Sequence, residues 1–76
     1  MMRIKLNTID DVSDFIEIVN KYEGNVDVKS GRMVFDGKSI VSLFGLGLSK
    51  PLDIHMISHK QKECDCFYNE IERWRV

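Results

Sequence analysis

The spacing of apolar residues switches repeatedly between the period of a β-strand and that of an α-helix along this 76-residue chain, which strongly limits its possible folds. From Arg3 to Asn7 polar and apolar residues alternate, with Ile4 and Leu6 on one side, which predicts a half-buried strand. The next apolar residues recur at i, i+3, i+4 and i+7, and they are Val12, Phe15, Ile16 and Val19. We expect this helix to end near Tyr22, with Gly24 as its stop.

The middle of the chain predicts a hairpin followed by a short helix. Val26–Val28 and Arg32–Phe35 are alternating segments on either side of a turn, in which Gly31 can take a positive φ. A helix is expected from Ser39 to Leu46, and Pro51 then forces the chain out of helical geometry.

The last part of the chain predicts one more strand, Leu52–Ile57, and a third helix. The residues that repeat at helical spacing to the end of the chain are Cys64, Phe67, Ile71 and Trp74. The order βαββαβα over residues 1–76 indicates a single α+β domain. We expect an open-faced sandwich, with a four-stranded, mainly antiparallel sheet covered on one face by three helices.

Charge and length exclude several classes of function. The 11 basic and 12 acidic residues give a net charge of −1, without the basic excess that nucleic-acid binding needs. The sequence contains no run of about 18 apolar residues, which a bilayer-spanning helix needs. The N-terminus lacks the apolar region of a signal peptide. A domain this small buries about 60% of its unfolded surface, so binding is expected at the surface. We therefore expect a cytoplasmic protein that binds neither nucleic acid nor membrane and needs no cofactor.

The expected second helix has more apolar surface than one sheet can bury. If Ser39 caps this helix, then Ile40, Val41 and Phe44 form an apolar strip separate from the inward-facing leucines. A strip of this kind either covers a thin core or binds a partner, and we favour a partner-binding surface.

The run from Lys38 to Leu48, in the topology described above, resembles the histidine-containing phosphocarrier protein (HPr) family of the bacterial sugar phosphotransferase system. The resemblance covers essentially the whole chain and implies the open-faced sandwich. In that family the start of the second helix carries a regulatory serine that HPr kinase phosphorylates, and Ser39 matches it. Gly24 matches a glycine after the family's first helix.

The chain departs from the family at the phosphocarrier site. HPr carries phosphate on a histidine at the start of its first helix, within a His-x-Arg-Pro motif. Counting back from Gly24 gives the matching positions, which are Asp11 for the histidine, Ser13 for the arginine and Asp14 for the proline. A phosphocarrier needs a nucleophilic imidazole and groups that hold the phosphoryl oxygens, so the resemblance implies that this activity is lost.

Asp11 has three possible roles. The simplest is a helix N-cap whose carboxylate accepts backbone amides. Its charge could also imitate a phosphorylated histidine, or it could take phosphate as an aspartyl phosphate, although its stretch of sequence lacks a lysine to stabilise such a group. We favour the cap.

The alternative to an HPr-like function is a small metal-binding protein. Cys64, Cys66, His59 and His55 are candidate ligands, but the Cys-x-Cys spacing differs from that of zinc knuckles. Cys64 also fits the apolar face of the last helix, and both cysteines are expected to be free thiols.

These observations favour a non-catalytic, HPr-like regulatory protein without phosphocarrier activity. The pattern is similar to that of the catabolite-repression HPr-like protein of Gram-positive bacteria, which lacks the histidine and keeps the serine. The resemblance implies Ser39 as a regulatory phosphorylation site, with Ile40, Val41 and Phe44 contacting a protein partner. HPr kinase and a transcription regulator are the partners it suggests.

Overall fold

The computed structural model describes residues 1–38 and 50–76. The strands are β1 (Met2–Lys5), β2 (Asn25–Ser30), β3 (Met33–Asp36) and β4 (Pro51–Ile57). The helices are α1 (Ile9–Lys21) and α3 (Gln61–Ile71), and a 3-10 turn, η1 (Glu72–Trp74), follows α3. In the described ranges the elements follow the predicted order with two α-helices, because the predicted second helix, residues 39–46, lies outside them. Its candidate site residues, Ser39, Ile40, Val41 and Phe44, lie outside them as well.

The four strands form one sheet in the order β1-β4-β2-β3, and every neighbouring pair is antiparallel. This confirms the predicted four-stranded antiparallel sheet. The turn between β2 and β3 contains Gly31 at a φ of 61°, a backbone conformation that favours glycine over residues with a side chain. The predicted hairpin is therefore present, with its glycine in the expected conformation.

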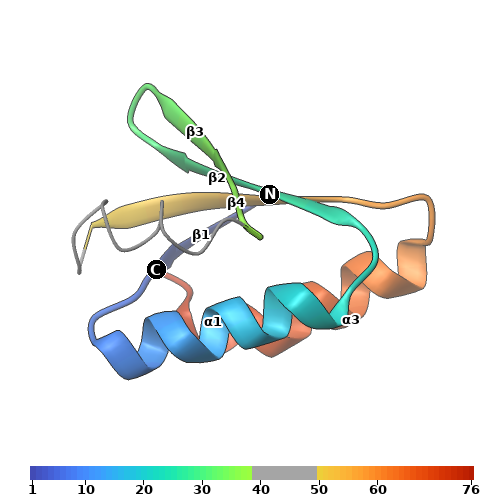
Figure 1. Ribbon diagram of the computed structural model, residues 1–76, viewed down its shortest axis with the longest axis horizontal. Coiled ribbons are helices and arrows are strands. Elements are labelled where there is room, and N and C mark those ends of the chain that lie inside the picture. The colour runs from blue at the N-terminus through green and yellow to red at the C-terminus, as the bar shows by residue number, and fades with distance from the viewer. Residues whose placement is uncertain (39–49) are drawn as a thin grey trace.

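Both helices cover the same face of the sheet, as Figure 1 shows. Alternate strand residues point toward them, and the core contains Ile4, Leu6, Val26, Val28, Leu52, Ile54 and Met56 from the sheet side. The helical side contributes Val12, Phe15, Ile16, Val19, Phe67, Ile71 and Trp74. The apolar residues that we assigned from their spacing to the first and last helices all belong to this core or pack against it.

The opposite face of the sheet carries charged and polar side chains. Asp53 of β4 lies between Arg3 of β1 and Lys29 of β2 in the strand register. The Arg3 Nε donates to the Asp53 Oδ1 at 2.9 Å, and this hydrogen bond is the main cause that lowers the pKa of Asp53. The alternation of the strands therefore separates an apolar face under the helices from an open, charged face.

The C-terminal segment lies along β1. Ile4 forms an isolated antiparallel bridge with Arg75, and the Val76 amide donates to the Arg3 carbonyl at 3.1 Å. The sequence analysis placed Trp74 in the last helix, but that helix ends at Ile71 and Trp74 belongs to the 3-10 turn. Trp74 is nevertheless buried, because the tighter turn still directs its ring into the core. Among residues 1–38 and 50–76, no helix has the length and apolar character needed to cross a membrane.

Candidate functional site

The start of α1 is the first candidate site, because the family resemblance places the phosphocarrier chemistry there. Thr8 is the N-cap: its backbone is extended, and its Oγ1 accepts a hydrogen bond from the Asp11 amide at 3.0 Å. The Thr8 carbonyl accepts from the Val12 amide at 3.2 Å. The prediction that Asp11 is the N-cap is therefore wrong. The helix begins earlier because the threonine hydroxyl satisfies a free amide of the first turn.

Asp11 lies in the first turn and supports the cap from there. Its Oδ2 accepts a hydrogen bond from the Asn7 amide at 3.1 Å, so Thr8 and Asp11 act together in the manner of a capping box. The hydrogen bond from Asn7 is the main cause that lowers the pKa of Asp11; burial opposes it, and the Trp74 and Thr8 side chains add to the lowering. The carboxylate is thus charged at neutral pH. Its contribution to stability is lost only as the pH falls through the lowered pKa.

Arg73 supplies a positive charge beside α1 that the sequence analysis missed. Its guanidinium lies 3.6 Å from the Asp14 Oδ2 and 4.1 Å from the centre of the Trp74 ring. A shallow depression of about 350 Å³ there is lined by Asp14, Glu17, Ile18, Lys21 and Arg73. Ser13, which counting placed at the family's arginine position, is exposed. The mixed charges of this depression favour ion pairing within the protein over capture of an anion.

Both histidines lie away from the start of α1. His55 is on β4, where it is exposed on the open face and stands opposite Asp27 of β2 in the strand register. His59 is in the loop before α3, which lies at the opposite end of α1 from Thr8 (Figure 1). Neither imidazole is therefore placed where the family carries its phosphate.

The candidate metal ligands do not form a cluster in the part of the chain that the structure describes. There, no group of three His, Cys, Asp or Glu side chains could hold a metal ion. Cys64 packs against the core, as its spacing predicted, whereas Cys66 is exposed, and both are free thiols. The geometry gives the metal-binding alternative no support.

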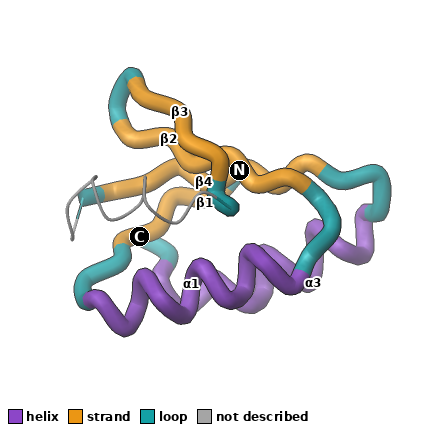
Figure 2. The backbone as a smooth tube through the Cα atoms, viewed as in Figure 1, coloured by secondary structure: helices purple, strands orange, loops and turns teal. Residues whose placement is uncertain are grey.

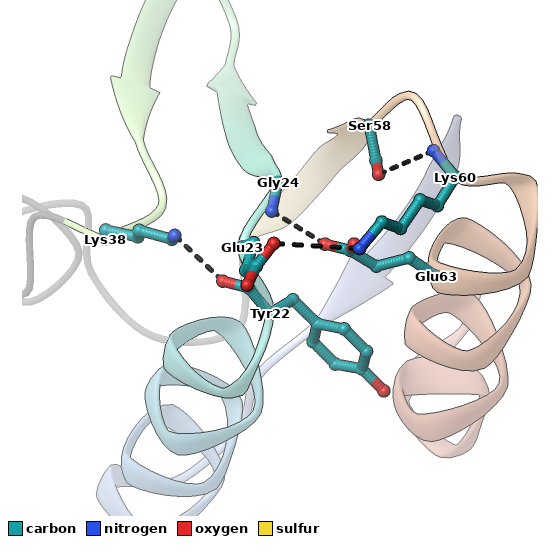
Figure 3. A network of polar contacts seen from close by, with 7 residues as sticks. All are labelled: Tyr22, Glu23, Gly24, Lys38, Ser58, Lys60 and Glu63. Carbon is teal, nitrogen blue, oxygen red and sulfur yellow. Dashed lines mark hydrogen bonds and ion pairs between the residues drawn. The ribbon is translucent and has the colours of Figure 1, made fainter.

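A second depression of about 350 Å³ lies where the end of α1 meets the start of α3. The Glu63 Oε1 accepts a hydrogen bond from the Gly24 amide at 2.7 Å, and the Lys60 Nζ lies 3.8 Å from the Glu23 Oε2. Figure 3 shows these side chains converging on the turn between α1 and β2. The Lys38 Nζ donates to the Tyr22 carbonyl at 2.9 Å. These contacts fix the turn and tie Lys38 to the end of α1.

Gly24→Ala is expected to destabilise the fold by about 1–3 kcal/mol, through overpacking. A Cβ at this position would stand 2.8 Å from the Ile57 carbonyl oxygen and 2.9 Å from the Met56 Cε, so the backbone itself must move. Urea unfolding measures the loss, and Gly31→Ala is a useful comparison because no atom lies within 4 Å there and any cost must come from its positive φ. A Gly24→Ala midpoint equal to that of the wild type would contradict this close approach.

A third polar cluster joins α1 to α3. The Tyr22 hydroxyl donates to the Glu70 Oε2, and the Lys21 Nζ pairs with the Glu70 Oε1. The pKa of Glu70 is lowered chiefly by the hydrogen bond from Lys21. Burial, and then the hydrogen bond to Glu70, raise the pKa of Tyr22. The hydroxyl is therefore held in its neutral, donating form.

Tyr22→Phe is expected to cost about 1.5–3 kcal/mol at neutral pH, the usual value for a hydrogen bond to a charged group. Because the pKa of Tyr22 is raised in the folded state, its stabilisation is complete below the unfolded pKa of about 10 and is lost at higher pH. Urea unfolding of the wild type and the variant gives the difference between their free energies of unfolding. This difference should be smaller above pH 10 than at neutral pH. A constant difference would exclude the neutral hydroxyl as its source.

With the geometry described, the class of fold is clear: an open-faced sandwich with one antiparallel sheet and helices on one face. The chain is similar to the crystal structure of HPr-C-His from Thermoanaerobacter tengcongensis, with a TM-score of 0.72 and 15% sequence identity over 92% of this chain and 88% of that one. No protein-family model and no curated protein sequence matches the chain significantly. The likeness establishes an HPr-like fold, as the sequence resemblance implied.

Proposed function

We propose that this chain is a non-catalytic, HPr-like regulatory protein without phosphocarrier activity, acting in the cytoplasm on the sugar phosphotransferase system. The observation that carries the proposal is the composition of the start of α1. The cap is a threonine, and the first turn carries Asp10 and Asp11. A hydroxyl engaged in capping and a carboxylate engaged by Asn7 cannot replace an imidazole that forms a transferable phosphoramidate.

The acidic first turn also opposes phosphate binding. A helix N-terminus favours anions through its free amides and its dipole. Here the Thr8 side chain takes the Asp11 amide, and the carboxylates of Asp10 and Asp11 lie in the same turn. A dianionic phosphoryl group approaching this end of α1 would meet like charges.

Regulation is proposed to act through Ser39, Ile40, Val41 and Phe44. The described residue next to them, Lys38, is anchored by its side chain to the Tyr22 carbonyl and by its amide to the Asp36 Oδ1, at 2.9 Å each. Phosphate on Ser39 would add charge beside an apolar strip, recruiting a partner with arginine side chains and releasing one that needs a neutral surface. HPr kinase and a transcription regulator are the proposed partners.

Intact-mass spectrometry after incubation with ATP and HPr kinase tests the proposal. We expect the wild type to gain one phosphate and Ser39→Ala to gain none. Ser13→Ala is the matched control, because Ser13 is an exposed serine on α1, and it should be phosphorylated like the wild type. Failure of the kinase to modify the wild type, or modification that persists in Ser39→Ala, would exclude the regulatory role of Ser39.

A further inference from the structure

The two edges of the sheet differ in how they are covered. The outer edge of β1 is bridged by the C-terminal segment through Arg75 and Val76. Among residues 1–38 and 50–76, no strand pairs with the outer edge of β3. Figure 2 shows the β2–β3 hairpin rising from the sheet, away from the helices. An open strand edge is a template for pairing with another strand.

The hydrogen-bonding pattern of the hairpin shows which backbone groups face outward. The Gly37 amide donates to the Val26 carbonyl at 2.6 Å, so these two residues form a hydrogen-bonded pair. Such pairs alternate with non-bonded pairs along an antiparallel ladder. In the register of β2 and β3, Val34 opposite Lys29 and Asp36 opposite Asp27 are then the non-bonded pairs. The N–H and C=O groups of Val34 and Asp36 therefore point away from β2.

The side chains at this edge are unusually apolar for a surface strand. Met33 and Val34 are 58% and 57% exposed, and they are consecutive residues, so they lie on opposite faces of the sheet. Natural edge strands are commonly protected by charged residues, proline or a bulge. The centre of β3, Met33-Val34-Phe35, has none of these features, and the charged Asp36 lies at its end.

The charges near the edge suggest what covers it. Asp27 and Asp36 stand directly opposite each other, and like charges in that arrangement are destabilising. Arg32 lies at the other end of β3, in the hairpin turn. If a second copy of β3 pairs antiparallel about Val34, Arg32 of each copy stands opposite Asp36 of the other. The same register places Met33 of each copy opposite Phe35 of the other.

We propose that the chain self-associates through β3 into a two-fold symmetric dimer, with Val34 on the axis and a continuous antiparallel sheet across both copies. The register satisfies the outward backbone groups of Val34 and places two Arg32–Asp36 ion pairs beside it. Strands of four residues bury less than the roughly 1,200 Å² at the lower end of stable interfaces. The dimer is therefore weak and forms at high protein concentration.

Sedimentation velocity over a series of concentrations tests the proposal with a pair of charge reversals. Arg32→Asp and Asp36→Arg should each remain monomeric, because each sets like charges against each other across the two-fold axis. An equimolar mixture of the two variants should dimerise, because both cross-strand pairs then have opposite charges. Lys62→Asp is the control, because it also replaces a positive charge by a negative one, at an exposed position of α3. It should dimerise like the wild type.

Val34→Pro provides a second test that does not depend on charge. Proline is tolerated on an edge strand where its missing N–H faces outward, so far-UV circular dichroism should show a folded chain that no longer dimerises. A wild type that stays monomeric at the highest concentration would overturn the proposal. So would a dimer that survives Val34→Pro, or a mixture of the charge variants that stays monomeric.

Discussion

Incubation with phosphoenolpyruvate and the general donor enzyme of the phosphotransferase system is expected to leave the wild-type chain at its unmodified mass. The start of α1 holds no imidazole, and Asp11 is engaged by the Asn7 amide. An aspartyl phosphate there would need a metal ion or a lysine nearby to stabilise it. Arg73 lies near this part of α1, but it pairs with Asp14. One added phosphate on the wild type would overturn the loss of phosphocarrier activity.

Two triple variants show which residues stand where the family carries His-x-Arg-Pro. If the family's histidine stands at the N-cap, which is Thr8 here, the motif falls on Thr8, Asp10 and Asp11; counting from Gly24 instead predicts Asp11, Ser13 and Asp14. We expect Thr8→His/Asp10→Arg/Asp11→Pro to gain phosphate, from none to a readily measured fraction. A histidine at the cap faces the free amides, and proline is tolerated in the first turn. Asp11→His/Ser13→Arg/Asp14→Pro should gain none, because its histidine lies inside the helix.

The outcomes of this pair separate two errors. Phosphate on the variant based on Asp11, and none on the variant based on Thr8, would contradict the helix start described for α1. Phosphate on neither variant, in chains that remain folded, would show that the donor enzyme does not recognise this surface. Treatment with mild acid is the control, since a phosphohistidine is acid-labile and a phosphoserine is not.

Much of the fold was predictable because local chemistry and long-range packing agree. Phe15 and Val19 on α1 have the helical spacing of a buried face, and both are fully buried. Gly31 was assigned to a turn because of its conformational freedom, and it does adopt a positive φ. In these elements each residue needs only its neighbours in sequence to indicate its environment.

The helix start was mispredicted because the sequence offers several caps in succession. Thr8, Asp10 and Asp11 are all residues that favour N-caps, and their propensities do not distinguish them. The choice is settled by reciprocal bonds: the Thr8 hydroxyl accepts from Asp11, while the Asp11 carboxylate accepts from Asn7. The cap at Thr8 therefore adds a second candidate, beside Asp11, for the residue at the family's histidine position.

The remaining features depend on contacts between distant segments. The sequence predicts Gly24 as a helix stop, but its amide also donates to the Glu63 carboxylate, and a Cβ there would stand 2.8 Å from the Ile57 carbonyl oxygen. Arg73 reaches Asp14 only because the chain turns after α3 and brings η1 beside α1. No local pattern indicates such contacts, since they arise only when the helices pack side by side.

Phe67→Ala is expected to destabilise the fold strongly, by about 3–5 kcal/mol. Phe67 is fully buried, and its ring packs edge-on against Tyr22 and Tyr68, with centroids 5.7 Å and 5.4 Å away. Removing the ring opens a cavity between α1 and α3, and the Tyr22 hydroxyl that bonds Glu70 loses its support. Domains of this size are stable by about 4–11 kcal/mol, so the variant loses a large part of its stability.

Thermal unfolding followed by circular dichroism measures this loss, and we expect the midpoint to fall by at least about 12 °C. Phe67→Leu keeps most of the volume and should cost about 1–2 kcal/mol. Cys66→Ala is the matched control, because Cys66 is the neighbouring residue and is exposed; it should change stability by less than about 0.5 kcal/mol. Equal midpoints for Phe67→Ala and Cys66→Ala would show that α3 does not pack on α1 through this ring.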